Sequence, residues 1–310
     1  MRKGLSIGVI TVLLLPICIL AVAGSPQTPV DTGIAEPVYQ FTYLQALILG
    51  IVEGLTEFLP VSSTGHLVLT ADWMGMSKSA KNAVDDFNVI IQGAAVLAII
   101  GLYRKRIAEM WNGVVHADPA GRKLILNLFI SFCPAAFVGV LFHHAIKEKL
   151  FNPTSIAGAL IVGGILMIIL ERIHRKKSGT SGVSVGEVTW KMALIIGIAQ
   201  IASLWPGTSR SMATILGGML AGLSLAAAAE YSFLLALPVI LAATVFELAK
   251  SYKEVFHHAS IGVFTVGMVA SAVVAAFAVK GFVKFLQRGG LSPFGWYRIA
   301  AGILVLWFVS

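Results

Sequence analysis

The sequence predicts an all-α polytopic membrane protein, built as an inverted-topology repeat with about six transmembrane helices and two re-entrant helix hairpins. Three observations predict this class. Of the 310 residues, 57% are hydrophobic and 12% are charged, which is far more apolar than a soluble domain. Apolar segments recur along the chain and are separated by short basic clusters. Two similar motifs each interrupt an apolar segment at a proline.

Six apolar segments are expected to form membrane-spanning helices, because long runs with few charges are stable in lipid only when helical. These are residues 87–102, 124–145, 155–170, 232–249, 261–279 and 295–308. The two repeated motifs lie outside these six segments and need a separate explanation.

The two motifs read as diverged copies of one another. Residues 50–66 are GIVEGLTEFLPVSSTGH, and residues 197–211 are GIAQIASLWPGTSRS. Pro60 and Pro206 are surrounded by Ser, Thr and Gly residues, and such a cluster breaks a helix in the middle of apolar sequence. Neither motif can therefore be part of an ordinary membrane-spanning helix.

Each broken segment is expected to form a re-entrant hairpin, the first at residues 44–73 and the second at 192–223. Each half of the chain then holds one hairpin and three spans, with repeat one at about 41–171 and repeat two at about 188–310. An odd number of spans turns the second half upside down relative to the first. Inverted repeats of this kind place the functional site near the midplane, where the broken elements meet.

The basic residues account for the formal net charge of +8 and gather at residues 104–123, 172–177 and 280–288. If the first hairpin enters the membrane from outside, all three clusters fall on the cytoplasmic side, as the positive-inside rule requires. This distribution explains the charge without nucleic acid as a partner.

The N-terminus reads as a separate unit. Residues 1–23 combine a basic start with an apolar stretch and an Ala-Val-Ala site, which is the layout of a signal peptide or an uncleaved anchor. Residues 24–40 form a polar linker, and residues 41–310 form the membrane domain. Either form of the leader delivers the linker to the outer side of the membrane.

Glu53 and Glu57 are spaced i, i+4 in the first motif, so their carboxylates project from one helix face. Two like charges in apolar surroundings repel one another and lose hydration, so they need a cation or a shared proton. The sequence therefore predicts a divalent metal bound by both acids. The alternative is a pair of protonated acids bonded to neighbouring helices.

Three hydroxyls and an imidazole follow Pro60, and these are Ser62, Ser63, Thr64 and His66. Hydroxyls after a helix break often only cap the next helix, and this alternative is open for Ser62 and Thr64. His66 is either a hydrogen-bonding structural residue or a catalytic base or nucleophile.

The second motif is predicted to be an anion site. Small residues precede an apolar segment whose helix would expose N–H groups and its positive dipole end. Arg210 adds a permanent, bidentate phosphate donor. The polar residues expected to contact substrate here are Gln200, Thr208, Ser209 and Ser211. Alternatively, Arg210 is structural and pairs with a buried acid, for which Glu230 is a candidate.

The two copies are complementary in charge. The second copy has Gln200 and Leu204 where the first has Glu53 and Glu57, and it has Arg210 where the first has Thr64. One copy would hold the metal and the nucleophile, and the other would hold the phosphate. This combination suits phosphoryl chemistry on a lipid head group.

From Phe41 to the C-terminus the chain resembles the bacterial undecaprenyl-pyrophosphate phosphatases of the bacitracin-resistance type. The motifs that carry the resemblance are residues 53–66, 87–92, 206–211, 229–238 and 296–299. The sequence departs from the family pattern at Met212 and Leu216, where smaller residues are commoner, and in its leader. These departures put the tail-binding surface in doubt and leave the residues named above in place.

The resemblance implies hydrolysis of undecaprenyl pyrophosphate at the outer face of the bacterial inner membrane, returning the monophosphate carrier to peptidoglycan synthesis and conferring bacitracin resistance. It implies Mg or Ca on Glu53 and Glu57, a phosphate clamp of Arg210 and Ser209, and attack by His66 with Ser63. A homodimer in the lipid bilayer is a possible assembly.

Two mechanisms fit these residues. Either a metal-polarised water attacks with His66 as base, or His66 or Ser63 attacks directly and forms a covalent intermediate. Direct attack is slightly favoured by the spacing of the two residues. The rival function is a polyprenyl-phosphate transporter or flippase, because inverted repeats with broken helices are typical of secondary transporters.

Overall fold

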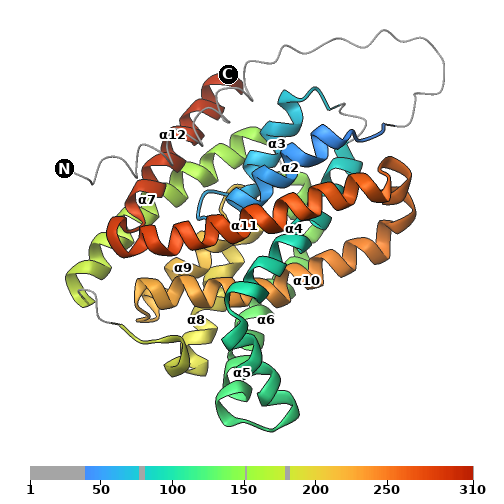
Figure 1. Ribbon diagram of the computed structural model, residues 1–310. Coiled ribbons are helices and arrows are strands. Elements are labelled where there is room, and N and C mark those ends of the chain that lie inside the picture. Colours follow the sequence, from blue (N-terminus) through green and yellow to red (C-terminus); the bar gives the residue numbers. More distant parts are fainter. Residues whose placement is uncertain (1–38, 77–80, 151, 179–181, 310) are drawn as a thin grey trace, which may run out of the picture.

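The computed structural model describes residues 39–76, 81–150, 152–178 and 182–309 (Figure 1). The predicted leader at 1–23 and nearly all of the linker at 24–40 lie outside the described residues. The described chain is helical throughout and contains no β-strand, as predicted; an isolated bridge joins Val183 to Leu223.

The described residues of the first half of the chain form six helices. They are α2 (Tyr43–Thr56), α3 (Ser63–Trp73), α4 (Lys81–Leu102), α5 (Arg104–Val115), α6 (Pro119–Leu150) and α7 (Pro153–Ser178). In Figure 1, α5 and the adjoining part of α6 extend away from the other helices.

The second half has a similar order of helices, and no helix among its described residues corresponds to α5. It contains the short 3₁₀ helix η2 (Val185–Glu187), α8 (Trp190–Gln200), the 3₁₀ helix η3 (Ile201–Leu204), α9 (Arg210–Leu220), α10 (Leu225–His258), α11 (Ile261–Gly289) and α12 (Ser292–Val309). At η2, Ser184 donates both its N–H and its hydroxyl to the Glu187 carboxylate, and these hydrogen bonds lower the pKa of Glu187.

Five helices of the described chain are long and apolar enough to cross a membrane. They are Asn82–Leu102, Pro119–Phe142, Pro153–Lys176, Leu225–Lys250 and Ile261–Gly289. They correspond to five of the six predicted spans. The sixth predicted span, residues 295–308, lies in α12, which has 18 residues and is not among these five.

Both motifs are broken where the prolines predict. The first motif contributes α2 and α3, and the second contributes α8, η3 and α9. Ser62 and Ser209 are the N-caps of α3 and α9, and both adopt positive φ, at 75° and 72°. Residues other than glycine rarely adopt positive φ, because this backbone conformation is strained for them. Such strained residues are common at functional sites.

The helices pack across the two halves of the chain. α2 packs on α11, and α8 packs on α6. In the same way α4 packs on α10, and α7 packs on α12. Close approach depends on glycines at equivalent positions of the two motifs. A Cβ at Gly50 would collide with the backbone of Gly267 in α11, and one at Gly197 would lie 2.7 Å from the Ser131 carbonyl oxygen in α6.

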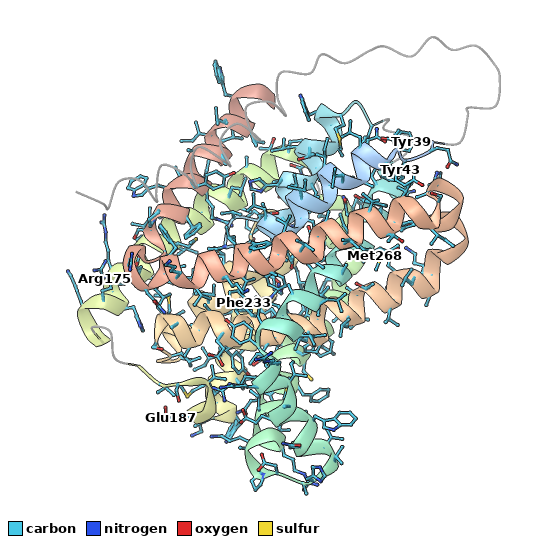
Figure 2. The ribbon with its side chains drawn as sticks, in the orientation of Figure 1. Tyr39, Tyr43, Arg175, Glu187, Phe233 and Met268 are labelled. Carbon is cyan, nitrogen blue, oxygen red and sulfur yellow. The ribbon has the colours of Figure 1, made fainter. Side chains whose placement is uncertain are left out.

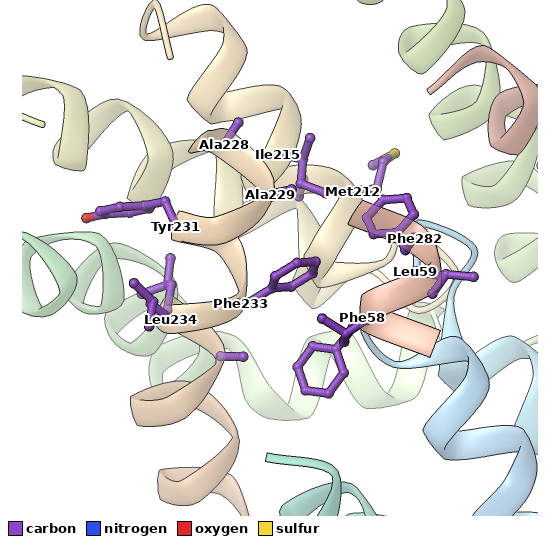
Figure 3. Close-up of a cluster of buried hydrophobic side chains, with 14 of the residues drawn as sticks. Phe58, Leu59, Met212, Ile215, Ala228, Ala229, Tyr231, Phe233, Leu234 and Phe282 are labelled. Carbon is purple, nitrogen blue, oxygen red and sulfur yellow. The ribbon is translucent and has the colours of Figure 1, made fainter. Parts of the chain in front are cut away.

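Aromatic side chains join the first break to the helices of the second half (Figure 3). Phe58 makes an edge-to-face contact with Phe233 of α10 at 5.8 Å between ring centroids, and Phe233 makes a second with Phe282 of α11 at 6.1 Å. Phe233 lies in the middle of the molecule, far from Tyr39 and Glu187 (Figure 2). Burial of these rings fixes the first break against α10 and α11.

Candidate active site

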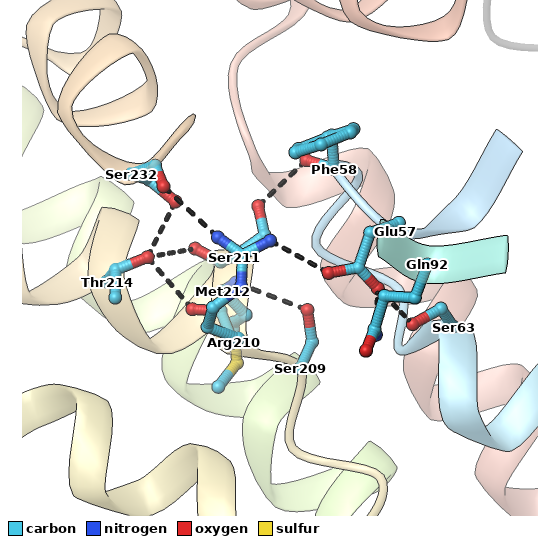
Figure 4. A network of polar contacts seen from close by, with 10 residues as sticks. All are labelled: Glu57, Phe58, Ser63, Gln92, Ser209, Arg210, Ser211, Met212, Thr214 and Ser232. Carbon is cyan, nitrogen blue, oxygen red and sulfur yellow. Dashed lines mark hydrogen bonds and ion pairs between the residues drawn. The ribbon is translucent and has the colours of Figure 1, made fainter. Parts of the chain in front are cut away.

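The two breaks meet through an ion pair between Arg210 and Glu57 (Figure 4). Arg210 Nη2 lies 2.8 Å from Glu57 Oε1, and the two side chains are 10% and 5% exposed. The structural alternative for Arg210 expected a buried acid as its partner, and that partner is Glu57; the candidate Glu230 is wrong, because it pairs with Arg106 at 2.8 Å. The predicted acid of the first copy is thus bound to the predicted phosphate donor of the second.

The second oxygen of the Glu57 carboxylate accepts two further hydrogen bonds. Ser63 donates its hydroxyl to Oε2 at 2.6 Å, and Gln92 of α4 donates its amide N–H to the same atom at 2.9 Å. Short hydrogen bonds to a charged acceptor are among the strongest in proteins. Ser63, Glu57 and Arg210 therefore form one connected group.

Arg210 is held from its other side as well. Its Nη1 donates to the Ser232 carbonyl oxygen in α10 at 3.1 Å, and its guanidinium carbon lies 5.8 Å from the centre of the Phe58 ring. The Ser232 and Thr214 hydroxyls bond one another at 2.6 Å behind it. The guanidinium is therefore oriented before any substrate arrives, and preorganised donors of this kind are the most effective in catalysis.

Glu53 lies one helical turn before Glu57 and is fully buried. No donor among the described residues pairs with either of its carboxylate oxygens, and Glu57 and Arg210 are the charged groups that act on it. A buried carboxylate without a partner is costly unless a cation or a proton compensates it. This orphaned acid fits the predicted metal ligand.

His66 does not hydrogen-bond Ser63. Its Nδ1 lies 2.7 Å from the Ser62 carbonyl oxygen, and its Nε2 lies 2.5 Å from the Tyr297 hydroxyl. Because a carbonyl oxygen only accepts, Nδ1 carries a proton, and a neutral imidazole then accepts the Tyr297 O–H at Nε2. Both ring nitrogens are therefore engaged with groups other than Ser63.

The remaining predicted hydroxyls have different surroundings. The Ser62 and Ser209 side chains accept from the N–H groups of Gly65 and Met212, so each caps its helix, as the capping alternative for Ser62 predicts. Ser211 donates to the Phe58 carbonyl oxygen at 2.8 Å. Thr64 is exposed, Thr208 is buried, and the amide oxygen of buried Gln200 has no partner among the described residues.

Four residues of the site were not assigned a role from the sequence. They are Gln92, Ser232, Tyr297 and Arg298. All four lie in segments that carry the family resemblance, and polar side chains within apolar runs were the available signal. Their partners are distant in sequence, so their roles could not be read from local pattern.

The helical membrane fold and the buried group of carboxylate, serine and arginine define a membrane protein equipped for phosphoryl chemistry. The family described as Bacitracin resistance protein BacA matches residues 46–304. The chain belongs to this family.

Relatives across bacteria are similar over nearly the whole membrane domain. The undecaprenyl-diphosphatase of Sorangium cellulosum is 50% identical over 266 residues, which cover 86% of this chain and 86% of the relative. That of Aromatoleum aromaticum is 47% identical over 266 residues, covering 85% and 93%. Undecaprenyl-diphosphatase 2 of Shewanella oneidensis is 42% identical over 264 residues, covering 85% and 97%.

Proposed function

We propose that this protein hydrolyses undecaprenyl pyrophosphate to undecaprenyl phosphate and inorganic phosphate. The observation that carries the proposal is the connected group of Ser63, Glu57 and Arg210, which joins both breaks of the membrane domain. The names of the relatives supply the substrate. A lipid-tailed substrate also suits the location, because its head can reach the buried site while its tail stays among lipids.

Ser63 is the nucleophile in this proposal and Glu57 is its base. The Ser63 hydroxyl already donates to Glu57, so its proton can pass to the carboxylate as the oxygen attacks the terminal phosphorus. The new bond joins the Ser63 oxygen to phosphorus, and the bond to the bridging oxygen breaks. Undecaprenyl phosphate leaves and takes the proton. Water then cleaves the phosphoserine and releases phosphate.

The ion pair couples proton transfer to phosphate binding. While Glu57 is charged, it shares the guanidinium of Arg210. When Glu57 accepts the proton of Ser63, it loses its charge, and the guanidinium is released to the phosphoryl oxygens where negative charge develops. Ser63 and Arg210 are the first residues of α3 and α9, so two helix N-termini also favour an anion here.

We propose that Glu53 holds the predicted divalent cation, Mg or Ca, and that Glu57 is its second ligand while the Glu57 carboxylate is charged. Among the described residues, no three His, Cys, Asp or Glu side chains group closely enough to bind a metal. The two acids would therefore share the cation with water and substrate phosphates, which is the usual coordination of Mg²⁺. Such an ion supplies charge neutralisation to the pyrophosphate.

We further propose the inverted-repeat topology with re-entrant hairpins, and a site open to the outer face of the inner membrane. The exchanged packing supports it: α2 of the first half packs on α11 of the second, and α8 packs on α6. If the two halves are related by a two-fold axis, a contact between α2 and α11 requires one between α8 and α6. The same axis brings α4 against α10 and α7 against α12, and both contacts are present. The basic clusters then face the cytoplasm, and the product re-enters peptidoglycan synthesis, which underlies bacitracin resistance.

Phosphate release by purified protein in detergent tests the function directly. With undecaprenyl pyrophosphate and Mg²⁺ or Ca²⁺, we expect steady phosphate release that is lost in Ser63→Ala. Rapid acid quench with substrate labelled at the terminal phosphate should leave the label on serine. In detergent a transporter has no gradient to use, so absence of phosphate release would favour the rival function of lipid-phosphate transport.

A further inference from the structure

Arg298 of α12 is fully buried, at 0% exposure, and forms no ion pair with any described residue. Arginine is rarely buried without a carboxylate, because removing its charge from water is costly. A buried, unpaired guanidinium beside a candidate active site therefore requires an explanation.

The guanidinium binds three backbone carbonyl oxygens from three parts of the chain. Nη1 donates to Pro60 at 3.2 Å, and Nη2 donates to Gly207 at 2.9 Å and to Ala159 at 3.0 Å. Pro60 lies in the first break, Gly207 in the second, and Ala159 in α7. A single side chain thus bonds both breaks at once.

These carbonyls lie next to the groups that act on phosphate. Pro60 is in the turn between Glu57 and Ser63, and Gly207 shortly precedes Arg210. The residue before Arg298, Tyr297, bonds His66 in the first motif. We propose that Arg298 is a positioning residue that holds the two breaks in the register where Ser63, Glu57 and Arg210 meet. This inference rests on the proposed phosphatase function.

Arginine suits this task better than lysine does. Carbonyls at a helix break have no helical partner and need donors inside the membrane. The planar guanidinium can reach several of them in different directions, whereas an ammonium is a compact point charge. The neighbouring helix makes room for it: a Cβ at Gly163 of α7 would collide with Arg298 Nη2 and lie 2.9 Å from Met212 Sδ.

A double-mutant cycle in kcat/KM tests the proposal. Arg298→Lys should lower kcat/KM on the order of 10²-fold, because displacement of reacting groups by about 1 Å has an effect of that size. In the Arg210→Lys background the same change should cost less than about tenfold, since the geometry that it protects is already lost. Arg106→Gln, which alters an arginine remote from both breaks, should have the same small effect in both backgrounds.

A purely structural Arg298 would give equal fold-losses in the two backgrounds, and that result would overturn the proposal. All rates are compared at equal amounts of monodisperse protein after size exclusion. Wild-type phosphate release combined with full activity of Arg298→Lys would refute this inference alone. No phosphate release by the wild-type protein would instead refute the proposed function.

Gly163→Ala perturbs the clamp without removing any donor and keeps the proposal testable if Arg298 variants do not fold. The added methyl group should displace the guanidinium and lower kcat/KM about tenfold or more, again with a smaller effect in the Arg210→Lys background. Gly158→Ala is the matched control in the same helix, because nothing lies within 4 Å of the added Cβ. Equal activity of the two alanine variants would contradict the proposal.

Discussion

The breaks of the first and second motifs share a backbone and differ in chemistry. Ser62 and Ser209 both adopt positive φ and cap the following helix, so Ser63 and Arg210 occupy the same position, the first residue of α3 and of α9. Comparison of the two sequences places Arg210 opposite Thr64, and this is wrong by one residue. The proposed nucleophile and the proposed phosphate clamp therefore occupy the same position relative to the break in each motif.

The buried positions before the breaks show a second contrast. Glu53 and Gln200 are both buried and both present side-chain oxygens without a partner in the described chain. The amide of Gln200 is neutral, whereas the carboxylate of Glu53 needs a compensating charge. The two motifs share this buried position, and the first carries the acids whereas the second carries the arginine. Each copy alone lacks half of the site.

Of the changes that test this contrast, the substitution of Ser63 should lower activity most. Ser63→Ala removes the nucleophile and should lower kcat on the order of 10⁴-fold or more, with phosphate release as the measurement. Ser260→Ala, which removes a helix cap of α11 remote from the site, is the control and should retain activity. Substantial turnover by Ser63→Ala would assign the attack to water.

Arg210→Ala should rank next. Loss of a charged donor from a preorganised site costs on the order of 10²- to 10³-fold in kcat, and it also leaves Glu57 without its ion-pair partner. Steady-state kinetics with a prenyl pyrophosphate measures the effect. Wild-type turnover would show that the second copy does not hold the phosphate.

Glu53→Gln and Gln200→Glu change the charge of a buried side chain and keep its shape. They therefore test the effect of that charge on metal dependence and on thermal stability. Glu53→Gln should abolish the dependence on added Mg²⁺ or Ca²⁺ and should raise the unfolding temperature in chelator by a few degrees, because an unpaired buried charge is removed. Gln200→Glu should lower that temperature, because it adds such a charge. Thermal unfolding in chelator therefore tests the site independently of turnover, and unchanged metal activation of Glu53→Gln would place the ion elsewhere.

The smallest effect is expected at the His66 and Tyr297 pair. Tyr297→Phe removes the hydroxyl that bonds His66, and His66→Ala removes the imidazole, yet neither contacts the Ser63 hydroxyl. Each should lower kcat about tenfold, which is less than the roughly 10²- to 10⁴-fold that a group transferring the proton contributes. A loss with His66→Ala as large as that with Ser63→Ala would restore His66 as the base or nucleophile.

The helical class and five of the six spans were predictable because each follows from local composition. A long apolar run must satisfy its own backbone hydrogen bonds in lipid, and only a helix does so. The prolines likewise predicted both breaks. The sixth segment lies in α12, which carries the fully buried Arg298. This side chain contacts other parts of the protein and not lipid.

The sequence by itself also determined which residue types could act on phosphate, since acids, hydroxyls and arginine within apolar sequence are costly unless they are used. Only the tertiary structure decided their partners. Arg210 pairs with Glu57 rather than Glu230, Ser63 donates to Glu57 rather than to His66, and Arg298 joins both breaks. These contacts join elements far apart in the chain, and their geometry arises from the packing of α2 on α11, α8 on α6 and α7 on α12. Spacing along one helix specifies a face, whereas the group that meets this face depends on how the helices pack.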